Sequence, residues 1–146
     1  MREYNPEAPV FHAATIAERW VEFANGHESG SVDFARERVI AFCGLGNPAS
    51  FWQTLSSLGI RPVETVEYGD HHSYSPAEVR RLAQLADELR ATTLLTTEKD
   101  AINLCEGAGS VLGGMRLFWL RIDLQIDDEE GLLDLVTSAR TPHLCR

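Results

Sequence analysis

Residues 69–74, which read GDHHSY, carry the side chains best suited to acid–base chemistry. They follow residues 62–68, which we expect to form a strand. A carboxylate such as Asp70 beside the imidazole of His71 fixes its tautomer and raises its basicity, as a general acid or base requires. The alternative is a polar loop in which Asp70 caps a turn and the histidines are solvated. The local sequence leaves both interpretations open.

A glycine-rich turn at residues 44–49 points to a second chemistry. It reads GLGNPA between an apolar run and a helical pattern, and so fits the dinucleotide fingerprint G-x-G-x-x-A. Glu67 lies about 20 residues further on, where a ribose-binding acid is expected. Pro48 counts against this function, because it lacks the N–H that a helix N-terminus would donate to a pyrophosphate. Local features favour a tight turn without a ligand, in which Gly44 and Gly46 supply unusual backbone angles.

A third polar stretch, TTEKD at residues 96–100, also ends an expected strand. Lys99 at a strand end could meet a phosphate or a partner carboxylate. We favour the simpler interpretation of a helix cap, formed by Thr97 with Asp100, and a local ion pair. The sequence contains no G-x-x-x-x-G-K-[ST], G-x-S-x-G or H-E-x-x-H motif, so no complete catalytic constellation is present.

The elements that would position these stretches alternate between strand and helix from residue 38 onwards. Apolar and β-branched runs predict strands at residues 39–43, 62–68, 92–97 and 117–122. Cap signals and helical spacing predict helices at residues 48–58, 76–89, 99–104 and 127–139. This order is typical of an α/β fold, a three-layer α/β/α (Rossmann-like) domain with a mostly parallel sheet. In such sheets ligands gather at the carboxyl ends of the strands, where all three polar stretches lie.

Residues 1–36 have a different pattern. Two short apolar segments, at residues 10–13 and 20–23, predict two short strands, and a loop rich in Gly, Ser and Asn follows at 25–31. We expect an N-terminal β-ribbon that serves as a linker or sheet edge rather than as part of the core.

Composition excludes several classes of function. With 146 residues, 44% of them hydrophobic, the chain can form one domain with a sizeable core. A formal net charge of −9 argues against non-specific nucleic-acid binding and against binding to anionic membranes. The apolar runs are far shorter than the roughly 20 residues of a membrane span, and the N-terminus has no secretory-signal pattern.

The cysteines and histidines predict neither a disulfide framework nor a metal site. Cys43, Cys105 and Cys145 are odd in number and widely spaced, which favours a reducing, cytoplasmic compartment. Zinc is disfavoured because the adjacent side chains of His71 and His72 diverge in extended chain. The other histidines are His12, His27 and His143.

Four stretches together resemble one family, the tetraacyldisaccharide 4′-kinases, which are the lipid A kinases of Gram-negative bacteria. The stretches are NPEAPVF at residues 5–11, AFCGLGNP at 41–48 with Phe51, DHH at 70–72, and TTEKDA at 96–101. They stand here in the family's order and approximate spacing. The resemblance runs from about Asn5 to Val136 and covers only the family's C-terminal half.

The resemblance implies transfer of the ATP γ-phosphate to the 4′-hydroxyl of a tetraacylated glucosamine disaccharide 1-phosphate glycolipid. His71 would act with an aspartate of the absent N-terminal half in activating that hydroxyl, and Asp70 would orient His71. Further residues would line or brace the cleft: Gly44, Gly46, Asn47, Thr97 and Lys99.

The resemblance also implies a division of labour. Residues 1–36 would link residues 37–146, the C-terminal α/β domain, to an N-terminal P-loop domain that binds most of ATP and Mg²⁺. That domain would hold the protein peripherally at the cytoplasmic face of the inner membrane, and this chain alone would not be catalytically competent. Two alternatives remain: a stand-alone Rossmann-like dinucleotide-binding module using residues 44–49 and Glu67, and a non-enzymatic regulatory domain.

Overall fold

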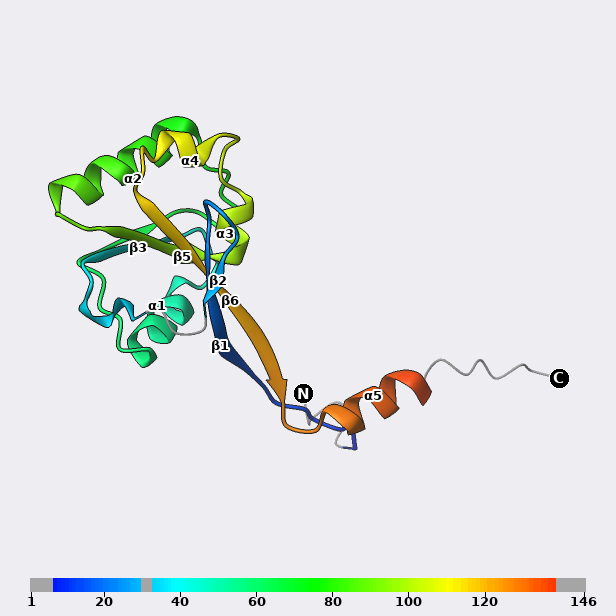
Figure 1. Ribbon diagram of the computed structural model, residues 1–146. Helices are drawn as coiled ribbons and strands as arrows, with labels where there is room; N and C mark the ends of the chain where they lie inside the picture. Colours follow the sequence, from blue (N-terminus) through cyan, green and yellow to red (C-terminus); the bar gives the residue numbers. More distant parts are fainter. Residues whose placement is uncertain (1–6, 30–32, 139–146) are drawn as a thin grey trace. The chain divides into compact units, whose positions relative to one another are not determined.

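The computed structural model describes residues 7–29 and 33–138 (Figure 1). The chain divides into two units, Ala17–Ile122 and a smaller one made of Met1–Ile16 with Asp123–Arg146. Cys145 and His143 lie outside the described residues, as do Asn5 and Pro6.

Six strands and five helices form the described chain. The strands are β1 (Ala13–Glu22), β2 (Glu28–Ser29), β3 (Val39–Cys43), β4 (Glu64–Glu67), β5 (Thr93–Thr97) and β6 (Arg116–Ile126). The helices are α1 (Pro48–Ser57), α2 (Pro76–Glu88), α3 (Glu98–Ile102), α4 (Ala108–Val111) and α5 (Glu129–Ser138), with a 3₁₀ turn η1 at Phe34–Arg36.

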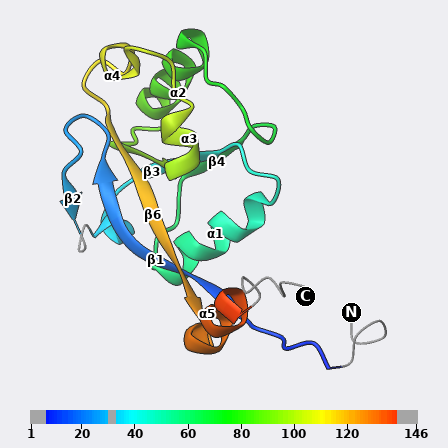
Figure 2. The same cartoon turned by 90° about the vertical axis from the view of Figure 1, so that its right-hand side faces the viewer.

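The strands form one sheet in the order β2-β1-β6-β5-β3-β4 (Figures 1 and 2). The pairs β3–β4, β3–β5 and β5–β6 are parallel, whereas β1 and β2 are antiparallel. The predicted α/β class with a mostly parallel sheet is therefore confirmed. Because β3, β4 and β5 are neighbours that run the same way, their carboxyl ends meet at one edge of the sheet, which we call the carboxyl edge.

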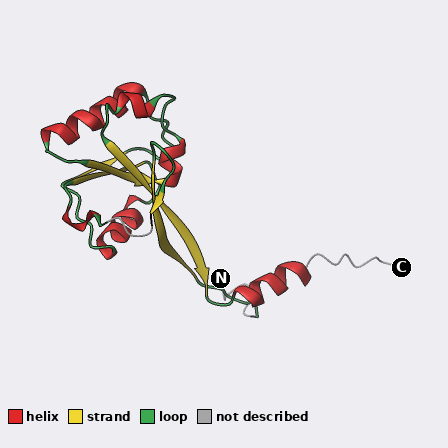
Figure 3. Ribbon diagram, viewed as in Figure 1, coloured by secondary structure: helices red, strands yellow, loops and turns green. Residues whose placement is uncertain are grey.

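Helices cover both faces of the parallel strands (Figure 3). One apolar cluster joins α1, through Phe51 and Leu55, to the side chains of Val39, Ala41 and Cys43. The alternate side chains of β3 pack in a second cluster with α2 and α4. A strand buried on both faces needs a continuous apolar sequence, which explains the run VIAFC in β3.

Helix α2 begins as its sequence predicts. Ser75 accepts a hydrogen bond from the Glu78 N–H, the Glu78 carboxylate accepts one from the Ser75 N–H, and Pro76 takes the first helical position. Asn47 is the N-cap residue of α1, but its side chain makes no capping hydrogen bond. Pro48, which has no N–H, opens that helix instead.

Three local predictions are wrong. Residues 13–22 form one strand rather than two short ones, and β1 contributes Trp20 and Val21 to the buried core because it lies inside the sheet, between β2 and β6. The last strand is predicted to end at residue 122, but residues 123–126 extend β6, since they continue its alternation of polar and apolar side chains. Helix α4 is absent from the prediction because its sequence, AGSV, is too short for a helical period.

The smaller unit contains the start of β1, the end of β6, and α5. The Asp127 N–H donates to the His12 carbonyl at 3.0 Å, and the His12 N–H donates to Asp127 Oδ1 at 3.0 Å. None of its described residues is buried. The part of the chain that the structure describes contains no helix long and apolar enough to cross a membrane.

Candidate functional site

Three residues singled out in the sequence meet at the carboxyl edge. Lys99 Nζ, at the start of α3, donates to Asp70 Oδ1 at 2.7 Å. A Cβ added to Gly46, in the turn after β3, would lie 3.2 Å from Asp70 Oδ2. Asp70 follows β4, Lys99 follows β5 and Gly46 follows β3, so the carboxylate lies where the ends of three strands meet. The predicted convergence at this edge is confirmed for Asp70, Lys99 and Gly46.

The Asp70 carboxylate is fixed and charged. Its Oδ1 also accepts the backbone N–H of His71 at 3.0 Å. The hydrogen bond from Lys99 holds the pKa of Asp70 below its usual range, with smaller contributions from the charge and backbone of His71. One oxygen is thus occupied by Lys99 and the His71 backbone, while the other faces the His71 ring.

The His71 imidazole lies beside Asp70 but is not hydrogen-bonded to it. Its Nε2 is 3.6 Å from Asp70 Oδ2, beyond hydrogen-bond length, and the side chain is 79% exposed. The expectation that Asp70 fixes the His71 tautomer therefore has no hydrogen bond to support it in this structure. A ring so exposed remains free to meet a substrate.

His72, to which the sequence gives no role, is the more embedded of the two histidines. Its side chain is 26% exposed, and its ring stacks on Tyr68 with centroids 4.6 Å apart. Its Nε2 lies 3.0 Å from Glu78 Oε1. No local sequence pattern predicts these contacts of His72, because Tyr68 precedes the loop and Glu78 follows it.

Asp100 is fully buried and ties the strand ends together. Its Oδ1 accepts from the Gly44 N–H at 2.8 Å and from the Tyr74 hydroxyl at 2.9 Å. Its Oδ2 accepts from the Thr97 hydroxyl at 2.5 Å. Burial and the nearby Asp100 raise the pKa of Tyr74, which keeps that hydroxyl a donor.

The sequence identified only part of this arrangement around α3. Thr97 Oγ1 does accept the Asp100 N–H at 3.2 Å, as the cap signal predicts. The expectation of a local ion pair is wrong, because Lys99 pairs with Asp70 across the carboxyl edge. The cap signal and the stretch TTEKDA both include Asp100, but neither indicates the carboxylate's other donors, Gly44 and Tyr74.

The glycine turn is filled by the protein itself. The prediction that Gly44 and Gly46 supply unusual backbone angles is wrong, because neither has a positive φ. A Cβ on Gly44 would lie 2.9 Å from the Gly69 carbonyl and 3.1 Å from Asp100 Oδ1, so glycine is required there by close backbone approach. The carboxylate of Asp70 lies beside Gly46, where it would repel a pyrophosphate. Glu67 accepts the Trp52 indole N–H at 2.8 Å. These contacts argue against dinucleotide binding at residues 44–49.

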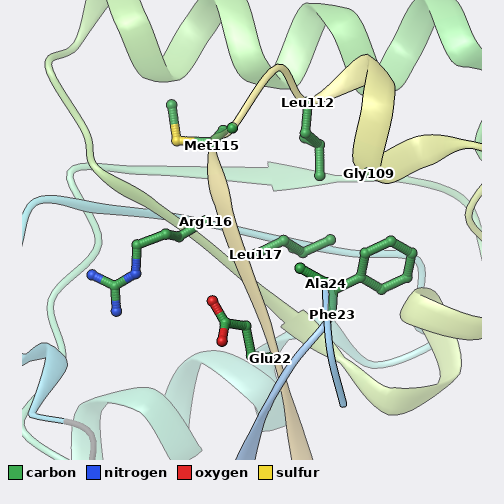
Figure 4. Close-up of a pocket in the computed structure, with 9 residues that line it drawn as sticks. Glu22, Phe23, Ala24, Gly109, Leu112, Met115, Arg116 and Leu117 are labelled. Carbon is green, nitrogen blue, oxygen red and sulfur yellow. The ribbon is translucent and has the colours of Figure 1, made fainter. Parts of the chain in front are cut away.

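In the described part of the chain, neither a metal site nor the cavity beside β6 extends this site. Among residues 7–29 and 33–138, no three His, Cys, Asp or Glu side chains are grouped as metal ligands. A cavity of about 120 Å³ is lined by Phe23, Leu112 and Leu117, among others (Figure 4). It adjoins the amino end of β6, so it lies at the sheet edge opposite to Asp70.

Replacing Lys99 with methionine is expected to raise the pKa of Asp70 towards its ordinary value. A carboxylate whose pKa is lowered by folding contributes stability above its unfolded pKa, and that contribution is lost as pH falls through the folded pKa. The variant should therefore be less stable than the unmodified chain at neutral pH, and the difference should vanish in acid. A carbon-detected NMR titration of the Asp70 carboxyl measures the pKa directly.

The matched control is Arg116→Met, since Arg116 pairs with Glu37 at the opposite edge of the sheet and has a similar exposure. Its Asp70 titration should be unchanged. An unchanged titration in Lys99→Met would show that the ion pair is absent in solution.

Comparison with known proteins gives consistent matches. The family model described as tetraacyldisaccharide-1-P 4′-kinase matches residues 2–140. A tetraacyldisaccharide 4′-kinase of Halothermothrix orenii is 34% identical over 109 residues, which are 68% of this chain and 28% of that protein. One from Methylorubrum extorquens is 38% identical over 112 residues, 77% of this chain and 32% of that protein.

A solved structure resembles the fold. The "apo" form of LpxK from Aquifex aeolicus, in complex with ATP, superposes with a TM-score of 0.56 at 24% identity, over 94% of this chain and 40% of that one. The chain thus spans about a third of the length of the curated relatives it matches. With a family model that matches nearly its whole length, the chain belongs to the tetraacyldisaccharide 4′-kinase family.

Proposed function

We propose that this chain is the C-terminal part of a kinase that transfers the ATP γ-phosphate to the 4′-hydroxyl of tetraacyldisaccharide 1-phosphate. Membership of the family supports the reaction class. The observation that carries the proposal is the Asp70–His71 pair, which lies at the carboxyl edge of three parallel strands, where ligands of such sheets bind.

His71 is the residue that would assist deprotonation of the sugar hydroxyl. Its exposed ring can reach a hydroxyl group, and a proton leaving that oxygen would generate an imidazolium beside the Asp70 carboxylate. The Asp70 carboxylate, whose Oδ2 lies 3.6 Å from His71 Nε2, would face that imidazolium. Lys99 keeps Asp70 ionised, and Asp100 holds the turn of Gly44 against the loop that carries His71.

The described residues do not fit a site for ATP and Mg²⁺. They contain no group of three metal-ligating side chains, and the sequence has no phosphate-binding loop. The Aquifex structure is a complex with ATP, and this chain matches only 40% of that protein. We assign the binding of ATP and Mg²⁺ to an N-terminal P-loop domain outside this chain, with residues 1–36 as the link and residues 37–146 as the C-terminal domain.

The smaller unit supports the existence of such a partner domain. Six of the ten exposed large hydrophobic residues in the described chain belong to it: Val10, Ile16, Leu124, Leu133, Leu135 and Val136. A ten-residue helix such as α5 is marginal in water unless its apolar face is packed. We infer that further polypeptide covers these side chains.

The charge of the smaller unit is unfavourable for contact with a membrane. Its described residues include seven carboxylates and no lysine or arginine: Glu7, Asp123, Asp127, Asp128, Glu129, Glu130 and Asp134. Such a surface is repelled by anionic lipids. In this proposal the protein works peripherally at the cytoplasmic face of the inner membrane, and contact with the membrane is made by the partner domain.

The test compares this chain alone with a complete kinase, meaning this chain joined to the remaining part of a longer relative such as the one from Methylorubrum extorquens. With γ-labelled ATP, Mg²⁺ and the tetraacylated acceptor, the complete kinase should label the lipid and the chain alone should not. Labelling by the chain alone would overturn the assignment of ATP to another domain. A well-folded complete kinase without transfer would favour a regulatory role.

A further inference from the structure

His71 occupies a backbone conformation that requires support. Its φ is +58°, in the left-handed region, which is uncommon and costly for a residue with a side chain. Such a conformation persists only where the surrounding structure holds it. On the N-terminal side, Asp70 is held by Lys99.

On the C-terminal side, the support is His72. Its ring stacks on Tyr68 at an interplanar angle of 27° and meets Tyr74 edge-on, with centroids 4.8 Å apart. Gly44 leaves room for it, since a Cβ there would lie 3.0 Å from His72 Cβ. One side chain thus contacts the ends of β3 and β4 and the residue before the α2 cap.

The hydrogen-bond partner of His72 is itself fixed. Glu78 presents Oε1 to His72, and its Oε2 accepts from the Ser75 N–H at 2.8 Å and the Ser75 hydroxyl at 2.6 Å. These bonds to Ser75 belong to the capping box that starts α2. They also lower the pKa of Glu78, so the acceptor stays charged. His72 is therefore anchored to a helix end rather than to a free surface side chain.

We propose that His72 is a positioning residue for His71, which fixes the left-handed turn so that the neighbouring imidazole points out from the carboxyl edge. The catalytic part of this inference rests on the proposed function. The structural part does not, because it concerns the order of one loop in this chain. A misplacement of about 1 Å can lower an enzymatic rate by about 100-fold, so the turn matters to a residue that must meet a hydroxyl.

The first experiment uses the chain alone. In His72→Ala, which loses both the stacking and the hydrogen bond, the ¹⁵N order parameter of the His71 amide should fall from about 0.85 to below about 0.6. His72→Phe retains an aromatic ring against Tyr68 but loses the bond to Glu78, and should give an intermediate value. His27→Ala, an exposed histidine in the turn between β1 and β2, is the matched control and should leave residue 71 unchanged.

The second experiment uses the complete kinase. His72→Ala should lower kcat by about 10–100-fold, leaving KM for ATP and for the acceptor within about twofold, and His72→Phe should recover part of the rate. A His72→Ala kinase in which only KM changes would overturn the proposal that His72 positions His71. So would a His72→Ala kinase with an unchanged kcat, if His71→Ala lowers kcat.

The two experiments separate the two proposals. An unchanged order parameter in a folded His72→Ala or His72→Phe chain overturns the inference whatever the kinase does. If the order parameter falls in His72→Ala but the kinase tolerates His71→Ala, then His72 does support the loop and His71 has no catalytic role.

Discussion

Replacing His71 with alanine lowers kcat of the complete kinase by about 10²–10⁴-fold, the range expected when a general base is removed. The 79% exposure of this side chain means that it has little packing to lose, so the fold should survive the change. KM for ATP should stay near its original value, because no described contact of His71 belongs to a nucleotide site. Initial rates of lipid phosphorylation over a range of both substrates measure the effect.

The control for this variant is His27→Ala in the same kinase, since His27 is also exposed and lies in a turn between other strands. Its kcat should stay within about twofold of the original. A near-normal rate in His71→Ala would return this residue to the alternative of a solvated loop histidine.

Replacing Asp100 with alanine lowers the free energy of unfolding by about 3–5 kcal/mol, the largest effect on stability that we expect in this chain. The change leaves three donors without their acceptor: the Gly44 N–H and the hydroxyls of Tyr74 and Thr97. Asp100 and Tyr74 are buried, so water cannot readily take the place of the carboxylate. Each buried polar group left unpaired costs about 1–3 kcal/mol.

Urea unfolding of the chain alone, followed by tryptophan fluorescence, measures this loss. Asp100→Asn keeps one acceptor oxygen and should lie between the original chain and Asp100→Ala. Asp87→Ala removes an exposed carboxylate from α2 and should change the free energy by less than about 0.5 kcal/mol. A loss below about 1 kcal/mol in Asp100→Ala would mean that the buried network contributes little.

The sequence predicts the elements well where the local signal and the fold agree. The run at β3 is apolar because both of its faces are covered, and the Ser75–Glu78 cap is complete within four residues. The meeting of Gly46, Asp70 and Lys99 follows from parallel strand order, which places strand ends at one edge. For the strand and the cap, adjacent residues contain the information that decides the structure, whereas the pairing of Lys99 with Asp70 needs the sheet itself.

The sequence predicts poorly what depends on distant partners. Asp100 looks like a helix-cap residue, and its role in joining strand ends becomes visible only when Gly44 and Tyr74 surround it. His72 cannot be told from His71 by type or neighbours. The difference arises because one ring faces Tyr68 and Glu78 whereas the other faces solvent.

The chain enters and leaves the unit Ala17–Ile122 through β1 and β6, which are neighbours in the sheet. A unit whose two connections lie on adjacent strands is joined to its polypeptide in the manner of an inserted domain. Both junctions can be cut and rejoined without threading the chain through the core. Recombination between relatives could therefore exchange this α/β unit as a cassette, with its carboxyl edge transferred intact.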